Sequence, residues 1–204
     1  MTNHILTEKV GNVFWIRFNR ANKYNAITSE MYHALIAAFD EADNDDEVSV
    51  TVLTGTGAFY CAGSDFSATE LQNSGWPSDS GTVAPYKLWT DRLILHSKLL
   101  VALVNGPAIG IACSTLGLCD VVLASDKAYF YCPFTTLGLN PEGCSSYTFV
   151  QLMGHIKAAR LILLSEKLSV KEACEAGLIS QVLMEQFRCD ETLERMMSKF
   201  SSKI

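Results

Sequence analysis

The stretch LVNGPAIGIAC, residues 103–113, leaves an apolar run through two glycines and enters a second apolar segment. The preceding residues LLVALVN (99–105) predict a fully buried strand, and IACSTLGL (111–118) predicts a buried helix. Glycine lets backbone N–H groups approach a ligand closely, and the first N–H groups of a helix lack intrahelical partners. The junction therefore indicates an α/β domain and could present N–H donors to a ligand.

A second junction of the same kind is VLTGTGAFYCAGSDF, residues 52–66. Two such junctions facing each other could aim two N–H groups at one oxygen, which is an oxyanion hole. Two ordinary tight turns would give the same spacing, so that alternative stays open. A dinucleotide site does not fit, because Tyr60 occupies the third glycine position of G-x-G-x-x-G. AGSDF also lacks the G-x-S-x-G frame of a serine nucleophile.

Outside these junctions the chain alternates between strand and helix patterns. VFWIRFN (13–19) and VSVTVLTG (48–55) predict strands, as do 120–125 and 128–132. Between the first two, Thr28 or Ser29 can cap a helix whose apolar stripe is Met31, Leu35, Ala38, Phe39 and Ala42. Residues 67–85 predict a surface loop or mobile lid. From Ser145 the pattern is helical, with Ser169 and Glu172 as a capping box, and the whole predicts one α/β domain over residues 1–204 with a helical C-terminal part.

Composition excludes several classes of function. The net charge is −6 over 204 residues, and no long basic run suits a nucleic-acid surface. No apolar run reaches the ~20 residues of a membrane span. The seven cysteines are odd in number and lack CxxC spacing, which predicts reduced thiols rather than disulfides or a zinc site. The four histidines are scattered, and no metal-binding motif such as H-E-x-x-H occurs.

Glu142 is the one acidic residue of TTLGLNPEGCSSYTF, residues 135–149. It lies between Pro141 and Gly143 in a stretch that is otherwise apolar, hydroxylic or small. An unpaired buried carboxylate is costly and is often functional. The alternative is that Pro141 and Glu142 begin a helix, where an acid suits the dipole. Both interpretations remain open at this point.

Four segments resemble the crotonase, or enoyl-CoA hydratase/isomerase, superfamily: CAGSDF, VNGPAIGIAC, CDVVLASDKAYF and LGLNPEGCSSYTF. The resemblance extends from about Thr7 to Val182, and it is greatest to the peroxisomal Δ3,Δ2-enoyl-CoA isomerases. It implies the ClpP/crotonase-like fold, a spiral of ββα units with a helical C-terminal part, and a homotrimer. It also implies an acyl-CoA substrate, with coenzyme A as part of that substrate and no separate cofactor or metal.

The resemblance also implies roles for individual residues. The thioester oxygen would accept from the backbone N–H groups of Ser64 and Ile111. The two hydratase glutamates would fall at Ser114 and Phe134, neither of which is acidic, whereas the single glutamate of the isomerases would be Glu142. The expected substrate-binding residues are Lys23, Tyr24, Ala26, Ala62, Gly63, Asp65, Phe66 and Gly110.

The implied function is the shift of the double bond of a 3-enoyl-CoA to the 2-trans position during β-oxidation of unsaturated fatty acids. The alternatives are hydration, thioester hydrolysis, or non-catalytic binding of acyl-CoA. Ala21 and Leu99 replace prolines that the family usually has, and the domain is expected to lack the family's last C-terminal helices. Ser202, Lys203 and Ile204 are similar to a Ser-Lys-Leu peroxisomal signal, so a peroxisomal location is expected, with the mitochondrion or cytoplasm as alternatives.

Overall fold

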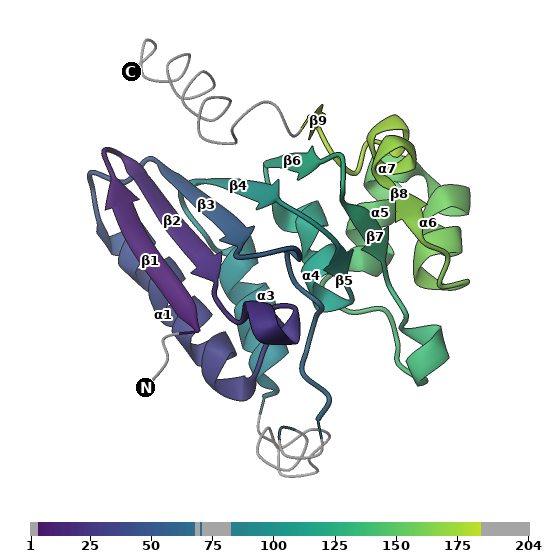
Figure 1. The fold of residues 1–204 in the computed structure, drawn as a ribbon, viewed down its shortest axis with the longest axis horizontal. Helices are drawn as coiled ribbons and strands as arrows, with labels where there is room; N and C mark the ends of the chain where they lie inside the picture. The colour runs from purple at the N-terminus through teal and green to yellow at the C-terminus, as the bar shows by residue number, and fades with distance from the viewer. Residues whose placement is uncertain (1–3, 68–69, 71–82, 185–204) are drawn as a thin grey trace.

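The computed structural model describes residues 4–67, 70 and 83–184, and it has the predicted α/β architecture (Figure 1). The larger sheet has the order β1-β2-β3-β4-β6-β9. Its strands are parallel except for β1, which pairs with β2 antiparallel. They are β1 (Ile5–Val10), β2 (Val13–Phe18), β3 (Val50–Gly55), β4 (Leu99–Val104), β6 (Val121–Ser125) and β9 (Gln181–Leu183).

A smaller sheet of order β5-β7-β8 lies beside the first, next to the C-terminal helices (Figure 1). Its strands are β5 (Ala108–Ile109), β7 (Tyr129–Tyr131) and β8 (Leu168–Ser169). The helices around it are α4 (Ile111–Ser114), α5 (Ser145–Met153), α6 (His155–Ile162) and α7 (Val170–Ala176), with 3-10 turns η2 (Thr115–Leu118) and η3 (Thr135–Leu137). The backbone of β5 leads directly into α4, so this sheet fixes where α4 begins.

Helix α1 (Ser29–Asn44) and helix α3 (Pro85–Ile94) pack against each other on one face of the larger sheet (Figure 1). The Oγ1 atom of Thr28 accepts from the N–H of Met31 at 3.2 Å, which is the predicted N-cap. The predicted apolar stripe of α1 is buried, and the capping box of Ser169 and Glu172 starts α7. These predictions are confirmed.

Two predictions differ from the structure. The helix expected over 111–118 ends at Ser114 and continues as the turn η2. The hydroxyls of Ser114 and Thr115 both donate to the carbonyl of Ile111, at 3.2 and 2.7 Å, and such back-bonding bends a helix. Strand β1 was not predicted, because only Ile5 of its six residues is buried and the apolar pattern is weak.

Some expectations fall on residues outside the described ranges: most of the loop 67–85, the end of the helical C-terminal part, and Ser202, Lys203 and Ile204. Across the ranges that are described, none of the helices has the length and apolar character that a bilayer crossing requires. In the same ranges, no three His, Cys, Asp or Glu side chains are grouped as a metal site would need.

Candidate active site

The two glycine junctions lie side by side. Cys61 pairs with Ala108 in a parallel bridge, and the N–H of Ile109 donates to the Cys61 carbonyl at 3.0 Å. A β-carbon built on Gly63 would lie 2.8 Å from the carbonyl oxygen of Ile109 and 3.6 Å from the Cα of Gly110. Gly63 also has a φ of +86°, so both its conformation and this close approach require glycine.

The main chain around Ser64 is held by Ile27 on one side. The N–H of Ile27 donates to the Gly63 carbonyl, and the N–H of Asp65 donates to the Ile27 carbonyl, both at 2.8 Å. In such a parallel ladder the N–H of the intervening residue points away from the partner, so the Ser64 N–H points away from Ile27. Within the described part of the chain, this N–H makes no hydrogen bond.

Ile111 supplies the second N–H. It is the first residue of α4, where the backbone N–H has no acceptor within the helix. The carbonyl of Gly110 accepts from Cys113 and Ser114, and the N–H of Gly110 donates to Tyr131 at 2.8 Å, so the start of the helix is anchored. Among the residues the structure describes, the N–H of Ile111 also lacks an acceptor. The side-by-side junctions therefore carry two free backbone donors.

Glu142 belongs to the loop that packs on this helix. A β-carbon built on its neighbour Gly143 would lie 2.4 Å from the Oγ of Ser114 and 3.2 Å from the Cδ1 of Ile111. The N–H and hydroxyl of Ser145 donate to the Glu142 carbonyl at 3.2 and 2.8 Å. Helix α5 begins only at Ser145, with Cys144 as N-cap. Glu142 thus precedes the helix and is not an acid in its first turn.

The carboxyl group of Glu142 is half-buried, and burial raises its pKa to about 7. Within residues 4–67, 70 and 83–184 it has no hydrogen bond or ion pair. Burial raises the pKa of Tyr32 on α1 and of Cys132 after β7. The charge of Glu142 adds a smaller increase to both pKa values. Burial and the same charge raise the pKa of Tyr86 on α3. The charge of Glu142 therefore acts on groups from three separate parts of the chain.

The predicted substrate-binding residues other than Gly110 come from two joined loops, residues 23–26 and 62–66. Lys23 and Tyr24 are exposed, and Ala26 is half-buried. The Tyr24 carbonyl accepts from the N–H of Ala62 at 2.9 Å, and the ring of Tyr24 lies 4.6 Å from that of Phe59. Phe66, at the far end of the second loop, is 43% exposed. The structure brings these loops together beside Gly63.

Two residues that were not predicted hold the loops in place. The side chain of Asn25 is fully buried, and its Oδ1 accepts from the N–H of Arg20 at 2.9 Å. Its two amide hydrogens are shared among three carbonyls, those of residues 56, 59 and 60. Arg20 forms an ion pair with Asp65 at 2.6 Å and also donates to the Ala26 carbonyl. The polar run NRANKYN (19–25) between apolar segments was the available signal, but its partners lie far along the chain.

Residues 8–203 match the profile of the enoyl-CoA hydratase/isomerase family. The chain belongs to this family. It is 43% identical to enoyl-CoA delta isomerase 2 of Rattus norvegicus, over 89% of this chain and 46% of that protein. It is 40% identical to the peroxisomal enoyl-CoA delta isomerase 3 of Mus musculus, over 89% of this chain and 57% of that protein. The chain thus spans about half the length of these curated relatives.

The fold is the crotonase fold of the enoyl-CoA hydratase/isomerase family. An enoyl-CoA hydratase/isomerase from Pseudoalteromonas atlantica T6c superimposes with a TM-score of 0.85 at 30% identity, over 94% of this chain and 74% of that one. The positions expected for the hydratase glutamates are occupied by Ser114 and Phe134, which are 0% and 2% exposed. Gly143 packs against the Ser114 hydroxyl so closely that a β-carbon at position 143 would clash with it.

Proposed function

We propose that this chain is a Δ3,Δ2-enoyl-CoA isomerase in which Glu142 moves one proton. The observation that carries the proposal is the half-buried carboxyl group of Glu142, without a described polar partner and with a pKa of about 7. A base whose pKa is close to the working pH is suited to both taking and returning a proton. Family membership and the two delta isomerase relatives support the same reaction.

The proposed reaction has two steps. The Glu142 carboxylate takes a proton from C2 of a 3-enoyl-CoA, and the electrons of that bond spread into a dienolate whose negative charge lies on the thioester oxygen. The N–H groups of Ser64 and Ile111 donate to that oxygen, and one such donor is typically worth ~3 kcal/mol. The protonated Glu142 then returns the proton at C4, which gives the 2-trans-enoyl-CoA. The reaction neither consumes nor releases water.

The residues at positions 114 and 134 favour isomerisation over hydration. A hydratase of this family holds and activates its water with two glutamates, and this chain has neither. The loop that carries Glu142 fills the space beside the first position, and Phe134 is part of the apolar core at the second. Hydration of crotonyl-CoA is therefore expected to be slow.

The experiment compares 3-enoyl-CoA isomerisation and crotonyl-CoA hydration in the wild type, Glu142→Gln and Glu41→Gln. Glu41 is an exposed residue of α1, so it controls for the loss of one negative charge. We expect wild-type isomerisation to exceed hydration, and the kcat of Glu142→Gln to fall at least ~100-fold with ligand binding kept. Isomerisation that survives in Glu142→Gln would exclude Glu142 as the base. Binding without any wild-type turnover would identify a non-catalytic acyl-CoA binder.

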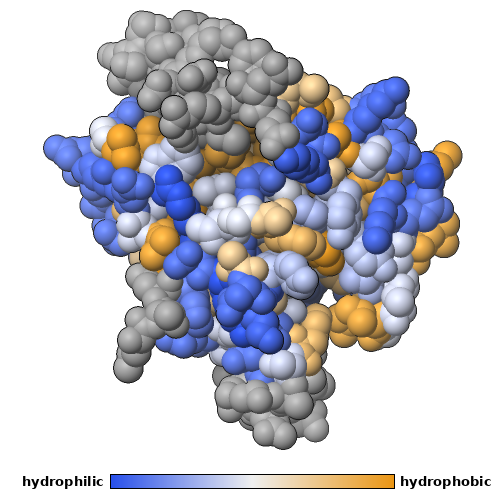
Figure 2. All heavy atoms as spheres, viewed as in Figure 1, coloured by the Kyte–Doolittle hydropathy of each residue, from blue (hydrophilic) through white to orange (hydrophobic). Residues whose placement is uncertain are grey.

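Assembly and location are part of the proposal. Leu137, Ile156 and Leu164 are each more than half exposed, and Figure 2 shows apolar atoms on the side of the molecule where α6 lies. Such a surface supports self-association into a trimer, which light scattering would detect and which Ile156→Glu should weaken. A peroxisomal location is proposed from the name of the mouse relative, and fluorescence microscopy of the tagged protein tests it.

A further inference from the structure

Ser64 has a second polar contact in addition to its backbone. Its Oγ lies 2.7 Å from the hydroxyl of Tyr32, which comes from the buried side of α1. Tyr32 is 5% exposed, and its ring packs on the fully buried Trp89 of α3 at 5.8 Å between ring centroids. The phenol is therefore held in one place between two helices and the glycine junction of residues 52–66.

The two hydroxyls carry two hydrogens, and the contact between them uses one. Within the described residues, no further hydrogen bond accepts the other. When Tyr32 donates, the hydrogen of Ser64 stays free. That hydroxyl belongs to the same residue as one of the two free backbone N–H groups. An oxygen that accepts from the N–H of a serine can also lie within reach of its hydroxyl.

We propose that the Ser64 hydroxyl is a third donor to the thioester oxygen and that Tyr32 is the positioning residue that orients it. Tyr32 donates to the Ser64 Oγ, which points the Ser64 hydrogen away from α1 and polarises it, because hydrogen bonds in a chain strengthen one another. The inference rests on the proposed function, since the donor acts on the charge that forms in that reaction. No bond other than a hydrogen bond is formed or broken by either residue.

The charge of Glu142 offers a competing target for the free hydrogen. The Glu142 charge raises the pKa of Tyr32, in addition to the larger effect of burial. A hydrogen bond to the carboxylate would favour its charged form, so removing that bond would move the acid limb of the pH–rate profile to higher pH. A bond to the thioester oxygen would instead leave the acid limb in place and lower the plateau.

The test uses Ser64→Ala, which keeps the backbone N–H, Tyr32→Phe, and the double variant. We expect each single variant to lower kcat for a 3-enoyl-CoA by ~10- to 100-fold, with KM within about twofold. The double variant should be no slower than Ser64→Ala, since both changes remove the same donor. Ser146→Ala and Tyr147→Phe, at exposed positions of α5, are the matched controls and should behave as wild type.

A second measurement does not depend on isomerase turnover. Acetoacetyl-CoA forms an enolate with its own ultraviolet absorbance, and the oxyanion donors should favour that enolate in the bound ligand. Ser64→Ala and Tyr32→Phe should raise the apparent pKa of the bound ligand by ~1 unit, a tenfold weaker preference for the enolate. An unchanged kcat and enolate pKa in both variants would overturn the inference, as would a shifted acid limb with an unchanged plateau. Absent wild-type isomerisation would instead reject the proposed function, and the enolate titration would still test the third donor.

Discussion

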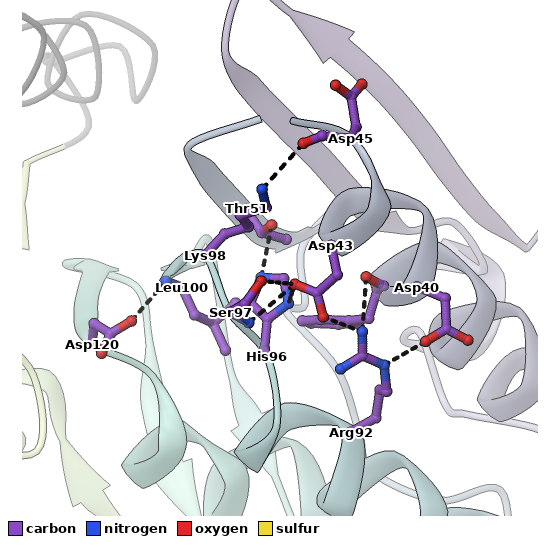
Figure 3. A network of polar contacts seen from close by, with 11 residues as sticks. Asp40, Asp43, Asp45, Thr51, Arg92, His96, Ser97, Lys98, Leu100 and Asp120 are labelled. Carbon is purple, nitrogen blue, oxygen red and sulfur yellow. Dashed lines mark hydrogen bonds and ion pairs between the residues drawn. The ribbon is translucent and has the colours of Figure 1, made fainter. Parts of the chain in front are cut away.

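Asp43 and Glu142 are both carboxylates that the fold partly removes from water, but their surroundings are opposite. Asp43 accepts from Arg92, from the N–H of Ser97 at 3.0 Å and from its hydroxyl at 2.8 Å (Figure 3). Burial alone would raise the pKa of Asp43, but these donors outweigh it and the pKa is lowered. Glu142 has no such donors in the described residues, so burial raises its pKa to about 7.

The contacts around Asp43 join α1 to the start of β4 and to β3. His96 lies between Asp43 and Thr51, with 2.8 Å from Nδ1 to the carboxylate and 2.9 Å from Nε2 to the Thr51 hydroxyl (Figure 3). Burial lowers the pKa of His96, although the charge of Asp43 opposes this effect. Thr51 is fully buried in β3, so its hydroxyl is not accessible to a substrate. A carboxylate with hydrogen-bond donors stabilises the fold, whereas a buried carboxylate without donors has a pKa at which it can take and return a proton.

The largest expected effect is on the pH–rate profile. A general base must be deprotonated, so the active fraction falls tenfold for each pH unit below its pKa. With the pKa of Glu142 at about 7, kcat/KM for a 3-enoyl-CoA should be ~100-fold lower at pH 5 than at pH 8. Circular dichroism at pH 5, with recovery of activity at pH 8, separates titration from unfolding. A pH–rate profile that is flat from pH 5 to pH 8 would contradict a base with a raised pKa at Glu142.

The next effect concerns stability. Burial raises the folded pKa of Glu142 from its ordinary value of 4.5 to about 7, so the wild type loses stability as the pH rises through this range. Glu142→Gln avoids that loss and should be more stable than the wild type by about 2 kcal/mol at pH 8.5, after allowance for partial exposure. The gain should vanish near pH 4.5. Urea unfolding at both pH values measures it, and a less stable variant at pH 8.5 contradicts it.

The smallest expected effect comes from Asp43→Asn. The amide weakens the contacts with Arg92 and Ser97, so the free energy of unfolding should fall by about 1.5 kcal/mol at pH 7 while kcat stays within about twofold. Asp43 has a lowered pKa, so its contribution is present above the unfolded value and is lost as the pH falls through the folded one. The loss of unfolding free energy caused by Asp43→Asn should therefore become smaller at low pH. Asp46→Asn, at an exposed position, is the matched control, and a large loss of kcat in Asp43→Asn would show that the two regions are not separate.

Features set by local sequence could be predicted. The N-cap at Thr28, the buried stripe of α1 and the capping box at Ser169 depend on residues within a few positions of one another. The two glycine junctions were recognisable for the same reason, although their contact was not. That contact depends on the parallel pairing of β3 with β4, which no local pattern specifies.

The remaining parts of the site depend on tertiary contacts. Tyr32 reads in sequence as one more apolar-side residue of α1, and its hydroxyl acquires a role only beside Ser64. Arg20 and Asp65 are far apart in the chain and meet as a half-buried ion pair. The burial of Glu142 was one of two open interpretations, because the same Pro-Glu-Gly run could have begun a helix. The structure decides between them, because α5 begins only at Ser145 and Glu142 is half-buried before it.

The bridge between Cys61 and Ala108 also has a consequence for how the protein acquires activity. The two strands that feed it, β3 and β4, are parallel, so their pairing requires closure of the long crossover that contains α3. Contacts between residues distant in sequence are the slow events of folding. In a refolding experiment, helical signal should therefore return before turnover does. Turnover then requires the completely folded molecule, and a partly folded chain is inactive even when most of its secondary structure has formed.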